Sequence, residues 1–221
     1  IARDIAICRL TGCPLHVQHL STARGLELVR AAKAEGLPVT CEVTPHHLFL
    51  TEDAIGDDYN TFLKVNPPLR TAEDVAAVRA GLADGTIDIV ATDHAPHAAE
   101  DKDCEWSAAA FGMTGLETAL AVVAQVMVAD GPFTWADVAR VLSVTPAQIG
   151  RVSDHGRPIA VGEPANLTLV DPAARTVVAA SAQQTASGNT PFAGLDLPGA
   201  VLWTFLRGRA TLAAGVPKAR A

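Results

Sequence analysis

The segment Ile87–His97 reads Ile-Asp-Ile-Val-Ala-Thr-Asp-His-Ala-Pro-His, a mainly apolar run that ends in a polar cluster. Its first half predicts a short strand, because buried strands are apolar runs of about four to eight residues. Two comparable runs precede it, at Leu15–Leu20 and Leu37–Val43, and a helix-like segment follows each of them. Strands that alternate with helices predict a parallel sheet with helices packed against it.

The helix-like segments have recognisable ends. Thr22 and Thr71 are typical N-cap residues, and the apolar positions that follow them recur at helical spacing until Gly36 and Gly85. We expect three more helices further along the chain. They are a long helix opened by a capping box at Thr114–Glu117 and running to about Ala129, one begun by Thr134 with Asp137, and a short one at Thr145-Pro146.

The pattern changes at about residue 151. Short β-rich runs, separated by Gly, Pro, Asn and Ser, occupy 157–165, 166–171, 175–180 and 200–207. Strands without intervening helices predict a small antiparallel unit. We therefore divide the chain into an α/β part, residues 1–150, and a β-rich part, residues 151–221.

Composition excludes several classes of partner and location. The 221 residues carry a formal charge of −7 and contain no run of Lys and Arg, which argues against nucleic acid or an anionic membrane as a partner. No apolar stretch is long enough to cross a membrane. The four cysteines form no Cys-x-x-Cys pair, so we expect reduced thiols in a cytoplasmic protein.

Polar clusters follow all three predicted strands of the α/β part. His19 ends the first, Thr44–His47 the second, and Asp93–His97 the third. Active sites of parallel α/β proteins lie at this end of the strands. We therefore expect the functional site at this edge of the sheet.

The pair His19 and Asp93 suggests a divalent metal. Imidazole nitrogen and carboxylate oxygen are ordinary zinc ligands, and zinc lowers the pKa of a bound water to about 7. A nearby carboxylate can then take the proton of that water as it attacks a carbonyl. His16 has a different spacing, and we expect it to face the helices or the core. The competing interpretation is that these are buried polar residues bonded to the backbone.

Other candidate residues are weaker on their own. His46 and His47 are adjacent on a segment that we expect to be extended, so at most one can face the site. Asn66 lies in a Pro-rich loop and could bond an amide-like substrate. Glu100–Asp103 is either a solvated loop or a mobile flap. Phe111-Gly112 stands before a helix start, where glycine lets a ligand approach the backbone.

Five motifs, in their order along the chain, resemble those of the dihydroorotases of the amidohydrolase superfamily. The resemblance is to the long bacterial type known as class I, and it is greatest to the actinobacterial members. The motifs are His19-Leu-Ser-Thr22, Glu42-Val-Thr-Pro-His-His47, Lys64-Val-Asn-Pro-Pro-Leu-Arg70, Ala91-Thr-Asp-His-Ala-Pro-His97 and Phe111-Gly-Met-Thr-Gly-Leu-Glu117. The resemblance extends to Gly162–Leu169 and so covers essentially the whole chain.

The resemblance implies a zinc enzyme that interconverts N-carbamoyl-L-aspartate and L-dihydroorotate in pyrimidine biosynthesis. By motif, His19 and Asp93 would be metal ligands, and Asp93 would also be the catalytic acid and base. Asn66, His97 and the backbone at Phe111 and Gly112 would bind the substrate. The resemblance does not make His46 or His47 a ligand. A full-length subunit would hold one or two zinc ions.

The family's remaining metal ligands have no counterpart in this sequence. The chain would supply strands 6–8 of a (β/α)8 barrel of the TIM type and the C-terminal part of a small β-sandwich. We therefore expect a C-terminal portion that lacks activity alone, holds zinc weakly or not at all, and packs against the missing N-terminal part or other copies.

Two alternatives stay open. A hydantoinase or allantoinase would share the metal site and differ in its substrate contacts. A non-catalytic homologue would be a partner of aspartate transcarbamoylase, although His19, Asn66, Asp93 and His97 are all intact. As a full-length enzyme the protein would act on a small molecule and form homo-oligomers.

Overall fold

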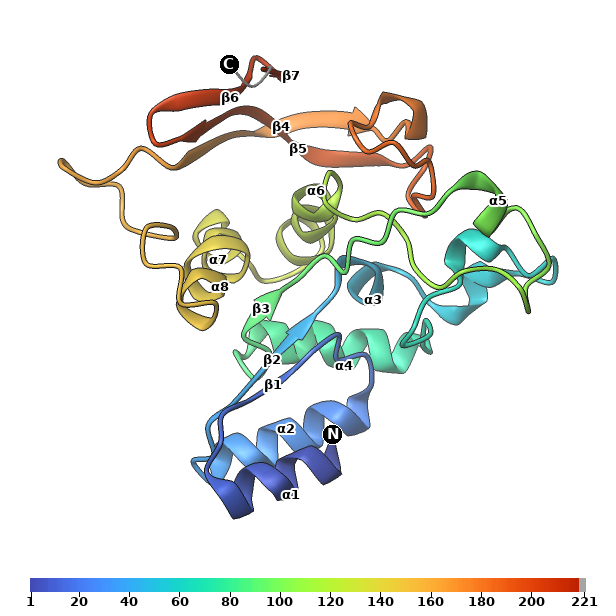
Figure 1. The fold of residues 1–221 in the computed structure, drawn as a ribbon, viewed down its shortest axis with the longest axis vertical. Coiled ribbons are helices and arrows are strands. Elements are labelled where there is room, and N and C mark those ends of the chain that lie inside the picture. Colours follow the sequence, from blue (N-terminus) through green and yellow to red (C-terminus); the bar gives the residue numbers. More distant parts are fainter. Residues whose placement is uncertain (219–221) are drawn as a thin grey trace.

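A computed structural model describes residues 1–218 of the chain. Its N-terminal part contains a parallel sheet in the order β1-β2-β3, formed by Leu15–Val17, Val39–Val43 and Ile89–Val90. The strands pair in parallel register, with His16 opposite Thr40 and Val43 opposite Val90. The parallel sheet expected from the three apolar runs is thus present (Figure 1).

Helices cover one face of this sheet. The longest are α1 (Ala2–Thr11), α2 (Ala23–Ala34) and α4 (Ala72–Ala83). The predicted caps are confirmed, because Thr22 Oγ1 accepts from Gly25 N at 3.1 Å and Thr71 Oγ1 from Asp74 N at 3.3 Å. The helices α2 and α4 pack against each other, and Figure 1 shows α4 behind the strands and α2 below them.

Alternation along β2 separates the two faces of the sheet. Val39, Cys41 and Val43 are buried in a core shared with α2 and α4. Residues of the opposite face are polar, and His16 lies among them, bonding Thr40 Oγ1 at 2.7 Å and Glu42 Oε2 at 3.0 Å. The expectation that His16 faces the helices or the core is wrong, because its register places it on the face opposite the core shared with α2 and α4.

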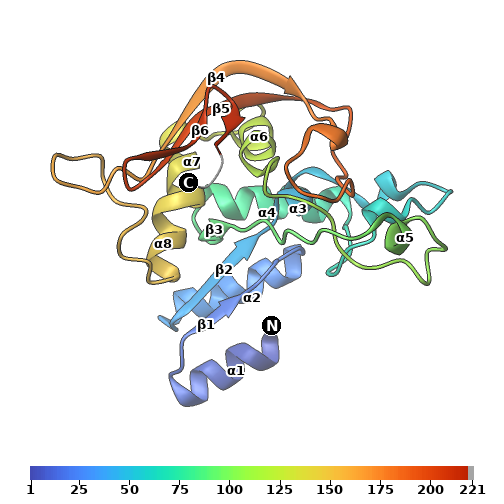
Figure 2. The ribbon, with the colours of Figure 1, turned by 45° about the horizontal axis from the view of Figure 1, so that its top comes forward.

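The C-terminal part is an antiparallel sheet in the order β4-β5-β6-β7. Its strands are Leu167–Val177, Asp196–Leu206, Arg209–Ala213 and Val216–Pro217. The runs predicted at 166–171 and 175–180 are one bulged strand, and the run predicted at 157–165 contains no strand. Figures 1 and 2 show this sheet lying across α6 (Ala119–Val123).

The helical connection between the two sheets differs from expectation at one point. The helix α6 continues as the π-helical segment η3 (Ala124–Ala129), but it begins at Ala119 and has no capping box. Glu117 instead accepts from the backbone N–H groups of Gln184 and Thr185, at distances of 2.8–3.1 Å. A long-range contact has therefore replaced the local cap.

The remaining helices are short. The Thr134–Asp137 capping box is confirmed at α7 (Trp135–Ala139), which continues through η4 (Arg140–Val144) into α8 (Thr145–Ile149). The others are α3 (Pro45–Phe49), η1 (Glu52–Ile55), η2 (Thr61–Leu63), α5 (Ala99–Lys102) and η5 (Ala180–Ala182). Among residues 1–218 no helix is long and apolar enough to span a membrane.

Candidate functional site

The two predicted metal ligands follow parallel strands and share an unusual backbone conformation. His19 lies just beyond β1 and Asp93 just beyond β3, with φ angles of 37° and 48°. A left-handed conformation at a residue other than glycine costs roughly 1–2 kcal/mol. Such strain concentrates at functional sites, and here it marks both predicted ligands.

His46 and His47 lie deeper behind the same edge. The segment is the short helix α3 and not the extended run that we expected, and both side chains are buried. Thr44 Oγ1 caps this helix by accepting from His47 N at 3.2 Å. The His47 ring bonds Thr44 Oγ1 at 2.8 Å and the Pro67 carbonyl at 3.0 Å. Because a carbonyl only accepts, Nε2 of His47 carries the proton and Nδ1 accepts from Thr44.

Burial keeps both of these histidines neutral. It lowers the pKa of His47 to about 4 and holds the pKa of His46 well below its ordinary value, with a further contribution from the nearby His19. The Nε2 atom of His46 is buried and has no hydrogen-bond partner among residues 1–218. A neutral imidazole with a free nitrogen therefore lies close to His19.

The predicted substrate contacts meet in one loop. The His97 Nε2 atom donates to the Phe111 carbonyl at 2.9 Å, which leaves Nδ1 of a neutral His97 ring as an acceptor. Gly112 has φ +127°, and a Cβ there would lie 2.5 Å from the Ala95 Cβ. Only glycine fits this close approach. The Phe111 side chain is 57% exposed beside it.

Asn66 belongs to the neighbouring loop. Its side chain is exposed, and it precedes Pro67, to which it is joined by a cis peptide bond. The Gly112 N–H donates to the Lys64 carbonyl at 2.9 Å, so the loops that carry Asn66 and Gly112 are directly bonded. The structure thus brings Asn66, His97, Phe111 and Gly112 into one connected region.

Asn189 is a structural part of this region that sequence reasoning missed. It is 3% exposed, its Nδ2 donates to the Ala95 carbonyl at 2.9 Å and the Gly112 carbonyl at 3.3 Å, and its Oδ1 accepts from His97 N at 3.3 Å. Ser187 bonds the His97 carbonyl at 2.5 Å. No local pattern around 187–189 indicates this role, because the partners lie about ninety residues away.

Two further residues near this edge have clear environments. Lys102, expected in a solvated loop or a flap, is fully buried at the end of α5, so the segment 100–103 is not simply solvated. His94 Nδ1 accepts from the N–H groups of Gly115 and Leu116 at 3.1 and 3.3 Å. His94 therefore fastens the turn before α6.

The metal donors of this edge are few. Among residues 1–218 no group of three or more His, Cys, Asp and Glu side chains is placed to hold a metal ion. His19 and Asp93 offer the right kinds of donor, one nitrogen and one carboxylate, but a catalytic zinc takes about three protein ligands. The donor atoms of the described residues are of the type that zinc binds, but they are fewer than a catalytic zinc site needs.

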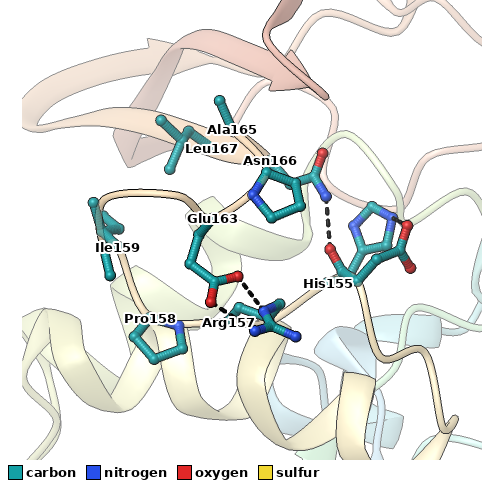
Figure 3. A pocket seen from close by; sticks show the side chains of 12 residues that line it. His155, Arg157, Pro158, Ile159, Glu163, Ala165, Asn166 and Leu167 are labelled. Atoms are coloured by element: carbon teal, nitrogen blue, oxygen red, sulfur yellow. Dashed lines mark hydrogen bonds and ion pairs between the residues drawn. The ribbon is translucent and has the colours of Figure 1, made fainter.

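A separate hollow of about 130 Å³ lies in the connection from α8 to β4 and contains His155 (Figure 3). Arg157 pairs with both oxygens of Glu163 there, and Asn166 Nδ2 donates to the Asp154 carbonyl at 2.7 Å. His155 lies in a loop. These contacts brace the connection and involve none of the predicted site residues.

Sequence comparison matches residues 3–211 to the amidohydrolase family. The dihydroorotase of Streptomyces coelicolor is 58% identical over 215 residues, which are 97% of this chain and 50% of that protein. The dihydroorotase of Mycobacterium tuberculosis is 51% identical over 211 residues, 96% of this chain and 49% of that protein. The chain thus spans about half the length of the curated relatives it matches.

This chain also covers about half the length of similar solved structures. The L-hydantoinase (dihydropyrimidinase) from Arthrobacter aurescens superposes with a TM-score of 0.91 at 32% identity, over 98% of this chain and 49% of that one. The D-hydantoinase (dihydropyrimidinase) from Thermus sp. gives 0.91 at 26% identity, over 99% and 49%. The predicted partial barrel and the resemblance to dihydroorotases are both confirmed. With its parallel sheet, its strand-end motifs and these relatives, the chain belongs to the amidohydrolase family.

Proposed function

We propose that the protein is a dihydroorotase, a hydrolase of cyclic amides that interconverts L-dihydroorotate and N-carbamoyl-L-aspartate in the cytoplasm as a step of pyrimidine biosynthesis. The observation that carries this proposal is the 58% identity to a dihydroorotase over 97% of the chain. The five motifs around His19, His47, Asn66, Asp93 and Gly112 support it, because they lie in the segments that follow β1, β2 and β3 and in the loops bonded to one another beside them.

We further propose that His19 and Asp93 are ligands of zinc. Bound zinc would supply a water of lowered pKa and polarise the carbonyl of the amide. The free Nε2 of the buried, neutral His46 adds a polar atom that lacks a partner near His19. The remaining ligands would come from the half of the relatives that this chain does not match, so residues 1–221 alone should hold zinc weakly and be inactive.

The chain's own residues then have distinct roles in the reaction. Asp93 accepts a proton as the attacking oxygen forms its bond to the carbonyl carbon, and it returns the proton to the leaving amide nitrogen. Asn66 offers both a donor and an acceptor to the substrate amide, and the free Nδ1 of His97 offers an acceptor. Backbone at Phe111 and Gly112 would pack against the substrate, since the N–H and carbonyl of Gly112 are bonded within the protein.

A hydantoinase is the second candidate, because the similar solved structures are hydantoinases. Their identities of 26% and 32% are well below the 58% of the dihydroorotase from Streptomyces coelicolor, which favours the first proposal. We also propose that the full-length enzyme forms homo-oligomers. A non-catalytic partner of aspartate transcarbamoylase is the third possibility, and it predicts no turnover at all.

The test is turnover of L-dihydroorotate, hydantoin and allantoin by the protein at the full length of its relatives. The proposal predicts that dihydroorotate has the largest kcat/KM. Preference for hydantoin would replace it with the second candidate. No turnover of any of the three, in a folded protein with zinc supplied, would favour the non-catalytic one.

A further inference from the structure

Two lysines lie buried directly behind the proposed substrate-binding loop. Lys102 is 0% exposed and Lys64 is 6% exposed. Neither forms an ion pair with a carboxylate of residues 1–218. The charged group packed against Lys102 is Lys64, and the other titratable group near it is Cys104.

Backbone carbonyls are the hydrogen-bond partners of both ammonium groups. Lys102 Nζ donates to the carbonyls of Ala110 and Gly112 at 2.8 and 3.0 Å, and to that of Lys64 at 3.4 Å. Lys64 Nζ donates to the carbonyls of Trp106 and Ala109, each at 2.6 Å. It also lies 4.5 Å from the centroid of the Phe111 ring, within the range of a cation–π contact.

Each carbonyl from 109 to 113 therefore has a protein donor. The donors are Lys64 for Ala109, Lys102 for Ala110, His97 for Phe111, Lys102 and Asn189 for Gly112, and the Ala95 N–H for Met113. The segment is therefore held along its whole length by donors from other parts of the chain, while the Phe111 side chain is 57% exposed. Its backbone cannot rotate without breaking one of these bonds.

Such an arrangement is costly for stability alone. Burial and the neighbouring Lys64 lower the pKa of Lys102 to about 8, which shows that the site disfavours the charged form. A buried charge without an opposite charge is destabilising in general, and apolar residues of similar size stabilise as well or better. The two ammonium groups offset part of this cost by donating to buried carbonyls. These carbonyls belong to the segment that carries the proposed substrate contacts at Phe111 and Gly112.

We propose that Lys102 and Lys64 are positioning residues that fix the 109–113 backbone against the loop of Asn66, so that Asn66, Phe111 and Gly112 meet the substrate in a set geometry. The inference rests on the proposed function for its substrate. The holding of the loop itself is independent of what the protein turns over.

The first experiment measures backbone amide hydrogen exchange in the full-length protein and needs no substrate. Lys102→Met keeps the apolar stem and removes the donors to the carbonyls of Ala110 and Gly112, so the segment 109–113 should open more often. The N–H groups of Ala110 and Gly112, which donate to the carbonyls of Asp101 and Lys64, should then exchange about tenfold faster. Lys33→Met is the matched control, because Lys33 is a partly buried lysine that pairs with Asp88 at 2.7 Å, away from the loop. Its exchange at 109–113 should equal that of the wild type.

The second experiment measures kinetics with L-dihydroorotate. Lys102→Met should raise KM about tenfold with a smaller change in kcat, because loss of one held carbonyl misplaces substrate contacts and leaves Asp93 untouched. In the wild type, KM should rise as pH passes through about 8, since neutral Lys102 has too few N–H donors for its three carbonyls. This pH step should be absent from Lys102→Met.

The outcomes separate the two proposals. Faster exchange confined to 109–113 supports positioning, whereas unchanged exchange, or an equal increase across β1–β3, overturns it. If Lys102→Met does not fold, hydrogen exchange in Lys64→Met decides in the same way, because that variant removes the donor to the Ala109 carbonyl. If the wild type does not turn over dihydroorotate, the proposed function fails, and hydrogen exchange still decides whether the lysines hold the loop.

Discussion

The carboxyl edge of the parallel sheet and the 109–113 loop both contribute to the proposed site, but different interactions hold them in position. His19 and Asp93 are placed by the paired backbones of β1, β2 and β3, which continue to within three residues of each side chain. The loop is placed by side chains that donate to its carbonyls from distant parts of the chain. Strand pairing can be predicted from local sequence patterns. Hydrogen bonds from distant side chains to the loop carbonyls cannot.

We expect the two regions to respond to opposite changes in pH. Neutral histidines lie behind the sheet edge, so acid should disturb it. A charged lysine with a lowered pKa lies behind the loop, so alkali should disturb that. Perturbations that affect one region and spare the other therefore test whether this division is real.

The largest expected effect is at the sheet edge. Asp93→Asn keeps the shape and removes the carboxylate, so kcat for dihydroorotate should fall about a thousandfold in the full-length protein because proton transfer and metal ligation are both lost. Asp57→Asn, at an exposed position outside both regions, is the matched control and should retain full activity. Equal activity of the two variants would contradict the role of Asp93.

Acid should weaken the same edge through His47. Its folded-state pKa of about 4 lies below the ordinary 6.5, so the unfolded chain binds a proton that the folded chain does not. Stability is therefore full above about pH 6.5 and falls as pH approaches 4, by about 3 kcal/mol for this group. Urea unfolding at neutral pH and near pH 4 measures it, and a free energy of unfolding that does not change between them is the contrary result.

Gly112→Ala should disturb the loop and spare the edge. The new Cβ would lie 2.5 Å from the Ala95 Cβ at a positive φ, and we expect a loss of about 2 kcal/mol in stability. Gly85→Ala is the matched control, because Gly85 has φ +81° and no atom within 4 Å of its Cβ position. The excess loss at Gly112 measures the close approach, and equal losses in thermal unfolding would show that no such contact exists.

Asn189→Ala should have a smaller effect on stability, about 1–2 kcal/mol, because it removes bonds to two buried carbonyls. Asn66→Ala provides the contrast, since Asn66 is exposed and should affect substrate binding with little change in stability. We expect the two variants to separate in a comparison of unfolding free energy with KM. If Asn66→Ala is the more destabilising of the two, the assignment of supporting and contacting roles is reversed.

Sequence patterns predict the sheet edge better than the loop. The caps at Thr22 and Thr71 and the three strands could be predicted, because each depends on residues within a few positions. The capping box at Thr114 was wrong, because Glu117 bonds the backbone of residues 184 and 185 instead. Glu117 therefore bonds a segment nearly seventy residues away in place of its own helix terminus.

The site shows the same limit. Motif order singled out His19, Asn66, Asp93 and Gly112, whereas Asn189 and the buried state of Lys102 carried no local signal. Lys102 stands in a run of charged residues that is typical of a solvated loop. Its burial arises from carbonyls at 64, 110 and 112, which converge on it only in the folded chain.

Zinc content per chain tests the central claim most directly. It should be measured in the full-length wild type, in His19→Gln, in Asp93→Asn and in His155→Gln, whose histidine lies in the connection to β4. The account predicts equal zinc in wild type and His155→Gln, and a clear loss in the other two, because each removes one ligand from the set. Undiminished zinc in both His19→Gln and Asp93→Asn would contradict the assignment of the sheet edge as a metal site.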